Sequence, residues 1–321
     1  MIRVSIIGAS GYTGGELLRI LLNHPECEVV HCFSLHNAGK AISAVHTDLL
    51  GDTSLCFSNT VYRDAEVYFL CMGHAKSREF IAEHSWLQEK YIIDLSNDFR
   101  LHSEDNDFVY GLPELHKQQI AQAKHVANPG CFATAIQLAL LPLAQSKLLT
   151  NDIHVSAITG STGAGQSLTD TVHFSWRTNN VQVYKAFQHQ HVPEIVQSLQ
   201  HAQPAWNNAL RFIPYRGNFT RGILASCYTT CSLSQNELTE LYHNYYHNQL
   251  FVHVVGEQPD IKQVVNTNKC FLHVEKHDDV VLITSVIDNL IKGASGQAVQ
   301  NMNLMFGVAE QTGLSLKATA F

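Results

Sequence analysis

The sequence predicts an α/β protein in two parts: a doubly wound parallel sheet, followed by an α+β part with a mixed, largely antiparallel sheet. Two observations support this division. Short apolar strands alternate with helix-like segments through the first 150 residues, which is the pattern of a parallel sheet with helices on both faces. From about residue 152 the pattern changes to longer extended runs separated by turns, which indicates a different kind of sheet.

The first part begins with a strand that runs directly into a glycine-rich turn and a helix. Residues 2–7 are apolar enough for a buried strand, and leucine and isoleucine recur at helical spacing over residues 16–22. The glycines between them follow the spacing GxxGxxG. Glycine lets the backbone approach a pyrophosphate, and the N–H groups of a new helix bind its charge. We therefore expect dinucleotide binding here, with a tight turn alone as the alternative; the residues concerned are Gly8, Ser10, Gly11, Tyr12, Thr13 and Gly14.

The next strand, residues 27–33, bears on the choice of cofactor, because its carboxyl end should face the adenine ribose. Enzymes that use NAD usually place Asp or Glu there to bind the 2′-hydroxyl. Here Ser34 follows the strand and Lys40 comes soon after, with no carboxylate between them. Hydroxyl and cationic groups suit a 2′-phosphate, so we predict NADP(H). A solvated loop is the alternative interpretation of these two residues.

Further strands complete the expected parallel sheet. Residues 67–72 form a strand that is followed by a helix over residues 75–81, and residues 91–95 form the next strand. Ligands gather at the carboxyl ends of such strands. We therefore expect residues 73–74, residues 96–100 and Cys131 to face the cofactor crevice.

Cys131 is the most informative residue of the chain. It follows the turn Pro129-Gly130 and precedes an apolar run, residues 135–141, that is typical of a helix. A thiol in the first turn of a helix is favoured as the thiolate by the helix dipole and by unpaired backbone N–H groups. We interpret Cys131 as a nucleophile. The alternative is a small buried hydrophobic residue, as most free cysteines are.

The second part is expected to contain six extended runs and to end in a helix. The helix covers residues 292–307 after a glycine-rich start, and we expect it to return to the first domain. The predicted domains are therefore a dinucleotide-binding domain, residues 1–130, completed by a C-terminal helix, residues 294–321, and a catalytic and oligomerisation domain, residues 131–293. The extended runs are residues 153–159, 209–214, 222–233, 251–255, 270–275 and 280–288.

Composition limits the possible classes of function. With 321 residues and 45% hydrophobic content, the chain is large enough for two cores. A net charge of -7 with 15% charged residues gives no basic surface for nucleic acid and no polybasic membrane anchor. No run of eighteen apolar residues occurs, and the chain opens into a strand rather than a signal peptide. We expect a cytoplasmic protein whose partner is a small molecule, neither nucleic acid nor a membrane.

Eight cysteines and nineteen histidines raise the question of a metal site. The cysteines form no CxxC pair and lie mostly in apolar runs, which favours reduced core residues. His189 and His191 could offer two imidazoles, but no third ligand follows at a spacing typical of zinc sites. We predict no metal. Histidines in loop-like surroundings, such as His24 and His46, are expected to be solvated.

The chain resembles the N-acetyl-γ-glutamyl-phosphate reductase family, which performs the NADPH-dependent third step of arginine biosynthesis. The matching blocks extend from Gly8 to Gly307, and the block around Cys131 is the most specific. This family is related to aspartate-semialdehyde dehydrogenase and glyceraldehyde-3-phosphate dehydrogenase, which share a two-domain plan and a cysteine nucleophile. The other blocks are residues 8–15, 94–100, 110–114, 160–165, 189–195, 221–224 and 292–301.

The resemblance implies a reaction path. Cys131 would attack the γ-acyl phosphate, expel phosphate and leave a thioester, which NADPH reduces to N-acetylglutamate 5-semialdehyde. The family pattern carries the acid–base role onto His189 and His191 without deciding between them. Relatives of this kind form dimers or tetramers, so a homodimer or homotetramer is expected.

The resemblance also implies ligand-binding residues. Arg100 and Arg221 are candidates for the substrate's carboxylate or phosphate, because a guanidinium group binds either with two hydrogen bonds; surface salt bridges are the alternative. Ser96 is expected to bind substrate. Gly163 is expected beside the nicotinamide or phosphate, and Asn301 is expected to bond the nicotinamide amide.

The chain departs from the family pattern at the anion-binding positions. Many relatives carry Arg where this chain has Gln190 and Gln166, and His where it has Tyr215. Arg216 is a compensating candidate. A sibling reductase of N-acetyl-aminoadipyl, carrier-protein-linked or aspartyl phosphate therefore stays an alternative, as does a non-catalytic NADP-binding regulator.

Overall fold

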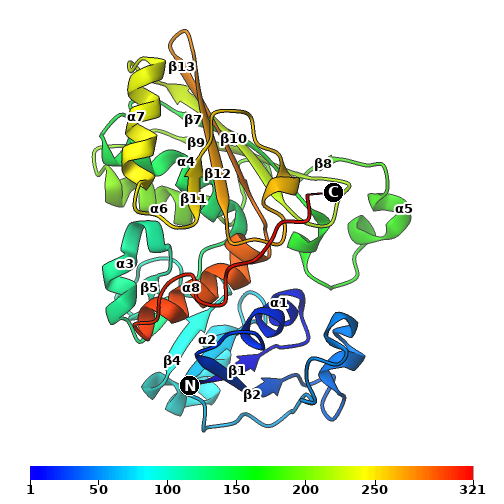
Figure 1. Ribbon diagram of the computed structural model, residues 1–321. Helices are drawn as coiled ribbons and strands as arrows, with labels where there is room; N and C mark the ends of the chain where they lie inside the picture. Colours follow the sequence, from blue (N-terminus) through cyan, green and yellow to red (C-terminus); the bar gives the residue numbers. More distant parts are fainter. Residues whose placement is uncertain (321) are drawn as a thin grey trace. The chain divides into compact units, whose positions relative to one another are not determined.

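The computed structural model describes residues 1–320, and the chain divides into two compact units (Figure 1). The first unit joins Met1–Gly130 with Ala294–Leu316. The second unit joins Cys131–Gly293 with the residues that follow Leu316. The C-terminal stretch 294–321, assigned above to the first domain, is thus shared between the two units.

The first unit contains a six-stranded sheet in the order β2-β1-β3-β4-β6-β5. Every strand pair in it is parallel. All four residues of β3 are buried, as expected for a parallel sheet that is covered on both faces. The strands are β1 (Ile2–Ile7), β2 (Cys27–Phe33), β3 (Val67–Leu70), β4 (Tyr91–Asp94), β5 (Val109–Tyr110) and β6 (His125–Ala127).

Four α-helices cover this sheet, and the last of them comes from the far end of the chain. Helix α8 (Gly296–Met305) packs against α1 (Tyr12–Leu21) and α3 (Pro113–Gln122), and all its residues are buried. Asn303 of α8 lies 3.0 Å from Nε2 of His24, which is therefore buried rather than solvated as predicted. The fourth helix is α2 (Ser77–Glu83), and the short 3₁₀ helices are η1 (Ile42–Ala44), η2 (Thr47–Leu49) and η3 (Ser85–Glu89).

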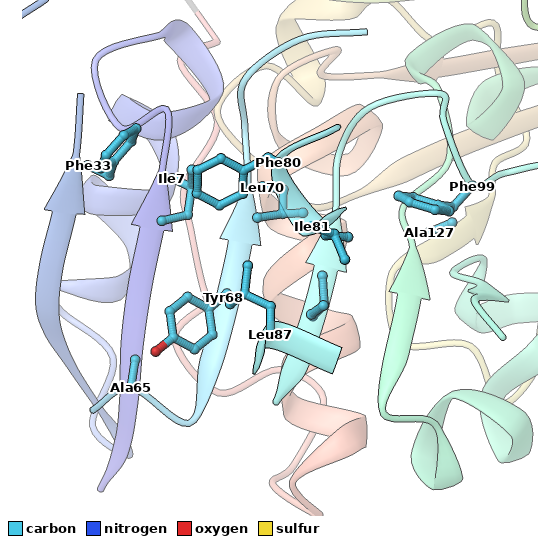
Figure 2. Packing of buried hydrophobic residues seen from close by; sticks show 11 residues of the cluster. Ile7, Phe33, Ala65, Tyr68, Leu70, Phe80, Ile81, Leu87, Phe99 and Ala127 are labelled. Carbon is cyan, nitrogen blue, oxygen red and sulfur yellow. The ribbon is translucent and has the colours of Figure 1, made fainter. Parts of the chain in front are cut away.

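Apolar side chains from the strands pack against α2 on one face of this sheet (Figure 2). Tyr68 and Leu70 of β3 meet Phe80 and Ile81 of α2 in this cluster. The Tyr68 hydroxyl donates a hydrogen bond of 2.7 Å to the carbonyl oxygen of Tyr62, so the phenol is buried without losing its partner. This core fixes the strand ends that carry the polar turns described below.

The second unit contains a seven-stranded sheet in the order β11-β12-β13-β10-β7-β9-β8. The pairs β11–β12 and β7–β9 are parallel and the other four are antiparallel. The predicted fold class is therefore confirmed. The sequence did not predict β8 in this sheet, nor β5 and β6 in the first sheet, because strands of two or three residues give little readable pattern. The strands are β7 (Ile153–Thr159), β8 (Gln182–Val183), β9 (Leu210–Arg216), β10 (Ile223–Thr230), β11 (Val252–Val254), β12 (Cys270–His277) and β13 (Val280–Ile287).

Three helices cover one face of this sheet (Figure 1): α4 (Cys131–Gln145), α6 (Val192–Ala202) and α7 (Gln235–Tyr246). Residues on the other face, such as Leu224, Ser226 and Tyr228 of β10, stay partly exposed. The remaining helical segments are α5 (Phe174–Arg177), η4 (Ser161–Ala164), η5 (Asp170–Val172), η6 (Ile261–Gln263) and the π-helical turn η7 (Ile291–Ser295).

Helix α4 contains a proline, and the neighbouring helix α7 supplies the hydrogen bond that the proline cannot make. Pro142 lies inside the helix and has no N–H to donate to the carbonyl of Leu138. The hydroxyl of Tyr246 in α7 donates to that carbonyl instead, at 2.5 Å, and Tyr242 donates to Ala139 O at 2.6 Å. Among the helices that the structure describes, none combines the length and apolar character needed to cross a lipid bilayer.

Candidate active site

The glycine turn of the first unit leads from β1 into α1. No side chain caps α1 at Gly11, so the partial positive charge at the helix start is not neutralised from within the chain. A Cβ on Gly14 would lie 2.6 Å from the carbonyl oxygen of Ala9, so only glycine lets the helix pack on its own turn. Tyr12 is exposed at the first position of α1. This turn has the features of an anion-binding loop.

His46 holds the glycine turn in place, and sequence reasoning missed it. Its Nε2 lies 2.8 Å from the carbonyl oxygen of Ala9, and a Cβ on Gly15 would lie 2.6 Å from its Nδ1. The expectation that His46 is solvated is wrong. The segment after β2 folds back over the turn and buries the ring, which local spacing does not reveal.

The structure brings together two hydroxyls at the end of β2. The Oγ atoms of Ser10 and Ser34 are 3.0 Å apart, and Ser34 N donates to Ser58 O at 2.9 Å. Lys40 is exposed farther along the loop, where its Nζ donates to Asn37 Oδ1 at 3.1 Å. Thr13 hydrogen bonds to the thiol of Cys71, whose pKa burial raises to about 12.

Ser96 and Arg100 are engaged within the first unit. Ser96 Oγ donates to Asp94 at 2.6 Å, and Ser77 Oγ donates to the same buried carboxyl group. Burial raises the pKa of Asp94 despite these bonds. Arg100 is buried and donates through Nε to Asn128 O and through Nη2 to Leu95 O. These contacts tie the end of β4 to the end of β6, which favours a bracing role over substrate binding.

Asn301 is also used as a brace. It is fully buried in α8, and its amide nitrogen donates to Gly111 O at 2.9 Å and to Asn128 Oδ1 at 3.1 Å. Its Oδ1 is buried and accepts no hydrogen bond from the described residues, so the contact with the nicotinamide amide that the resemblance implies stays a prediction. The geometry favours a role in holding the residues after β5 and β6.

In the second unit, Cys131 is the first residue of α4 and its side chain is partly exposed. The turn at Gly293 passes directly over it: a Cβ on Gly293 would lie 2.8 Å from the Cβ of Cys131. The N–H of Gly293 donates to Asp288 O at 2.9 Å, which fixes this approach. The placement at the helix start is the one that favours a thiolate.

The two histidines predicted for acid–base chemistry lie beside Phe132, the neighbour of Cys131 in the sequence. Both are buried, their ring centroids are 4.6 Å apart, and they lie 5.5 and 6.3 Å from that of Phe132. His191 N donates to His189 Nδ1 at 3.2 Å, so a neutral His189 carries its proton on Nε2. His191 Nε2 lies 3.9 Å from the carboxylate of Glu194 in α6.

Tyr184 joins this cluster although sequence reasoning gave it no role. Its ring centroid lies 5.7 Å from that of His189. Burial raises the pKa of Tyr184, and the negative charge of Cys131 raises it further. The guanidinium carbon of Arg216 lies 4.7 Å from the ring centroid. Tyr184 follows the two-residue strand β8, where no periodic pattern draws attention to it.

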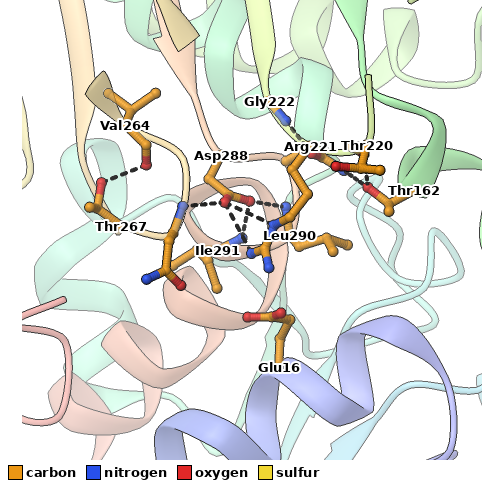
Figure 3. A network of polar contacts seen from close by, with 12 residues as sticks. Glu16, Thr162, Thr220, Arg221, Gly222, Val264, Thr267, Asp288, Leu290 and Ile291 are labelled. Atoms are coloured by element: carbon orange, nitrogen blue, oxygen red, sulfur yellow. Dashed lines mark hydrogen bonds and ion pairs between the residues drawn. The ribbon is translucent and has the colours of Figure 1, made fainter. Parts of the chain in front are cut away.

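Arg221 is held by a buried carboxylate, Asp288, at the end of β13 (Figure 3). Its Nε donates to Asp288 Oδ2 at 3.1 Å, and Asn266 N donates to the same oxygen at 2.6 Å. Oδ1 accepts from the backbone N–H groups of Leu290 and Ile291. Sequence reasoning missed Asp288, although a carboxylate directly after a long apolar strand was a signal.

Gly163 lies on η4, a segment tied to the chain before Arg221. Thr162 Oγ1 donates to Thr220 O at 2.6 Å and accepts from Asn289 Nδ2 at 3.0 Å (Figure 3). Gly163 itself is exposed. Within residues 1–320, no group of three or more His, Cys, Asp or Glu side chains could hold a metal ion.

Comparison with known proteins identifies the family. Residues 3–123 match the semialdehyde dehydrogenase NAD binding domain, and residues 131–289 match the semialdehyde dehydrogenase dimerisation domain. The N-acetyl-gamma-glutamyl-phosphate reductase of Bacteroides thetaiotaomicron is 54% identical over 322 residues, covering 100% of both chains. The chain belongs to the N-acetyl-γ-glutamyl-phosphate reductase family. The enzyme of that name from Flavobacterium johnsoniae is also 54% identical, over 325 residues and 100% of both chains.

Solved structures agree with this membership at the level of the fold. Aspartate semialdehyde dehydrogenase II of Vibrio cholerae has a TM-score of 0.76 at 16% identity, covering 96% of this chain and 98% of its own. Aspartate semialdehyde dehydrogenase of Candida albicans, solved with NADP, has a TM-score of 0.72 at 12% identity, covering 95% and 98%. The sequence-based resemblance to the N-acetyl-γ-glutamyl-phosphate reductase family is confirmed, and the first unit is of the nicotinamide-cofactor-binding kind.

We expect thiol reactivity in this family member to single out Cys131 and the exposed Cys56. Burial raises the pKa of Cys27, Cys32 and Cys71 to about 12, so near neutral pH these thiols stay protonated and unreactive. Brief iodoacetamide treatment followed by peptide mass spectrometry should therefore find two alkylated cysteines. The Cys131→Ser variant should keep only Cys56. Alkylation of Cys71 as fast as that of Cys131 would contradict this expectation.

Proposed function

We propose that this chain catalyses the NADPH-dependent reduction of N-acetyl-γ-glutamyl phosphate to N-acetylglutamate 5-semialdehyde and phosphate, a step of arginine biosynthesis. Full-length relatives named for this reaction support the substrate. The observation that carries the mechanism is the position of Cys131 at the first turn of α4, next to a ring that contacts both His189 and His191.

The first step is acyl transfer to sulfur. The Cys131 thiolate attacks the acyl carbonyl, a C–S bond forms, and the C–O bond to phosphate breaks with release of inorganic phosphate. The resulting thioester is more electrophilic than a carboxylate or oxygen ester. Backbone N–H groups at the start of α4 are positioned by the helix itself to stabilise the oxyanion, an effect worth about 3–4 kcal/mol in measured cases.

The second step needs a hydride and a proton donor. The nicotinamide cofactor, when bound, supplies the hydride that reduces the thioester. The histidine pair exchanges a proton with the oxygen of the resulting thiohemiacetal, whose C–S bond then breaks to release the aldehyde and return the Cys131 thiolate. His189 fits the donor role, because its Nδ1 accepts a backbone N–H and its Nε2 then carries the proton. Glu194 lies 3.9 Å from Nε2 of His191 and can hold the orientation of that ring.

The cofactor is NADP(H) in this proposal. The uncapped start of α1 suits the pyrophosphate. At the end of β2 the hydroxyl pair of Ser10 and Ser34 offers donors to a 2′-phosphate, with no acidic residue between Ser34 and Lys40 to oppose its charge.

The reverse reaction tests the substrate and the mechanism together. With phosphate and N-acetylglutamate semialdehyde, wild type should form NADPH, and Cys131→Ser should lose at least about a thousand-fold in rate because the thioester cannot form. Cys56→Ser, the exposed cysteine, is the matched control and should stay active. Equal rates with aspartate semialdehyde would overturn the substrate assignment, and an active Cys131→Ser would overturn the mechanism.

A carboxylate placed at Ser34 should reverse the cofactor preference. Ser34→Glu would repel a 2′-phosphate and accept a hydrogen bond from a 2′-hydroxyl, so the ratio of kcat/KM for NADP to that for NAD should fall by about ten-fold or more. Ser54→Glu, on an exposed residue of the same connection, should leave the ratio unchanged. A wild type that prefers NAD would refute the choice of cofactor.

The second unit also supports a homodimer. The match to a dimerisation domain covers residues 131–289. Alternate residues of β10 are partly exposed on one face of its sheet, and the segment around α5 exposes Leu168 and Phe174, which are 96% and 78% accessible. Asp170 and Lys185 give this segment charges of both signs, so two identical copies can meet without like charges facing each other. The occupant of this apolar surface is a second copy of the chain.

Light scattering coupled to size-exclusion chromatography tests this assembly. Wild type should elute at twice the monomer mass. The double change Leu168→Asp with Phe174→Asp should shift it toward the monomer, because burial of two new charges opposes association. Leu50→Asp, at an exposed leucine of the first unit, is the control and should remain dimeric. A monomeric wild type at micromolar concentration would disprove the dimer.

A further inference from the structure

Arg216, the last residue of β9, lies on the same side of its sheet as the nucleophile. Alternate residues of a strand point to one face, so Arg216 shares its face with Phe212. The ring of Phe212 lies 5.2 Å from that of Phe132 and 5.4 Å from that of His189. Strand β9 therefore brings the Arg216 side chain to the cluster that surrounds the start of α4.

The Arg216 guanidinium has no anionic partner. The guanidinium carbon of Arg216 lies 4.7 Å from the ring centroid of Tyr184, the Arg216 side chain also hydrogen bonds to Tyr184, and its Nε is buried without a hydrogen bond. Within the described residues, no carboxylate forms an ion pair with it. A buried donor of a charged group is costly when it stays unsatisfied. A bound anion would remove that cost.

A second guanidinium adds positive charge at the same place. Arg177 is buried and donates through Nη1 to the carbonyl oxygen of Arg216 at 2.9 Å. Arg177 also donates to Thr171 O and Gln182 Oε1, which are uncharged. Burial lowers the pKa of Arg177, and the positive charge of Arg216 lowers it further. Two neighbouring cations without a carboxylate form a site that favours an oxyanion.

One aromatic ring separates this positive charge from the reacting centre. The ring centroid of Tyr184 lies 5.7 Å from that of His189 and 4.7 Å from the guanidinium carbon of Arg216, and the charge of Cys131 raises the pKa of the Tyr184 hydroxyl. Arg221 differs from Arg216, because its guanidinium is paired with the buried carboxylate of Asp288. The uncommitted charge of this cluster is that of Arg216.

We propose that Arg216 binds an oxyanion of the substrate, its phosphate or its α-carboxylate, while the acyl carbon reacts at Cys131. The proposal rests on the proposed function and names the anion-binding residue of that same site. Tyr184 is the positioning residue, since its ring holds the guanidinium plane. If the bound anion is the α-carboxylate, the Arg216 side chain also selects acyl phosphates that carry this second negative group.

Steady-state kinetics of the reverse reaction separates the two anions, because phosphate and the aldehyde are then distinct substrates. Arg216→Met should raise the KM for one of them by about ten-fold or more. A rise for phosphate assigns the phosphate, and a rise for the aldehyde assigns the carboxylate. Arg216→Lys should recover part of the loss. The control Arg211→Met removes an arginine of the same strand that is 53% exposed and paired with Asp152, and both KM values should stay unchanged. Unchanged KM values in Arg216→Met would overturn the proposal.

Thermal unfolding tests the site without turnover. Inorganic phosphate or N-acetylglutamate should raise the Tm of wild type and of Arg211→Met, and the rise should be lost in Arg216→Met for the anion that binds there. If wild type is stabilised in this way but does not oxidise the aldehyde, the proposed function fails while the anion site stands. If neither anion raises the Tm of wild type, the anion site itself is refuted.

Discussion

The arrangement of the catalytic unit depends on one buried carboxylate. Asp288 accepts hydrogen bonds from Arg221, from Asn266 and from two backbone N–H groups of the turn that follows it. A buried charge with this many donors is held in a single position, because each lost bond would leave a charge unsatisfied in the interior. The carbonyl oxygen of Asp288 also binds the N–H of Gly293. Asp288 therefore fixes both the turn at Gly293, which lies against Cys131, and the side chain of Arg221.

Four arginines near the candidate site differ in the partners of their guanidinium groups. Arg100 binds main-chain carbonyls, Arg221 binds Asp288, and Arg177 binds main-chain and amide oxygens. These contacts satisfy the guanidinium groups inside the protein, where an unpaired charge would be costly. Arg216 stacks on a ring and leaves a buried Nε unbonded. The presence of an arginine in the sequence therefore does not predict anion binding until the hydrogen-bond partners of its guanidinium group are known.

The sequence predicts the strands of both sheets well because their signal is local. The runs predicted from alternation and apolar character correspond to β1, β7 and β13, and each of these strands begins and ends within one residue of the predicted bounds. Cys131 is also found locally, since a Pro-Gly turn followed by an apolar run begins a helix. The prediction that His24 and His46 are solvated failed, because segments distant in the sequence bury them. His24 is buried by α8, and His46 is buried by the segment that folds back after β2. Tyr184 and Asp288 likewise owe their importance to neighbours that no spacing rule supplies.

The proline inside α4 has an evolutionary consequence. Pro142 leaves the Leu138 carbonyl without its helical donor, and a phenol from α7 supplies the missing bond. A phenylalanine at position 246 would leave the Leu138 carbonyl oxygen buried without a hydrogen bond. A residue other than proline at position 142 would donate its own N–H to that oxygen, so the phenol would no longer be needed. Residues 142 and 246 are consequently expected to change together in evolution. Replacement of Pro142 should come first, because it restores the helical N–H donor, and replacement of Tyr246 can then follow.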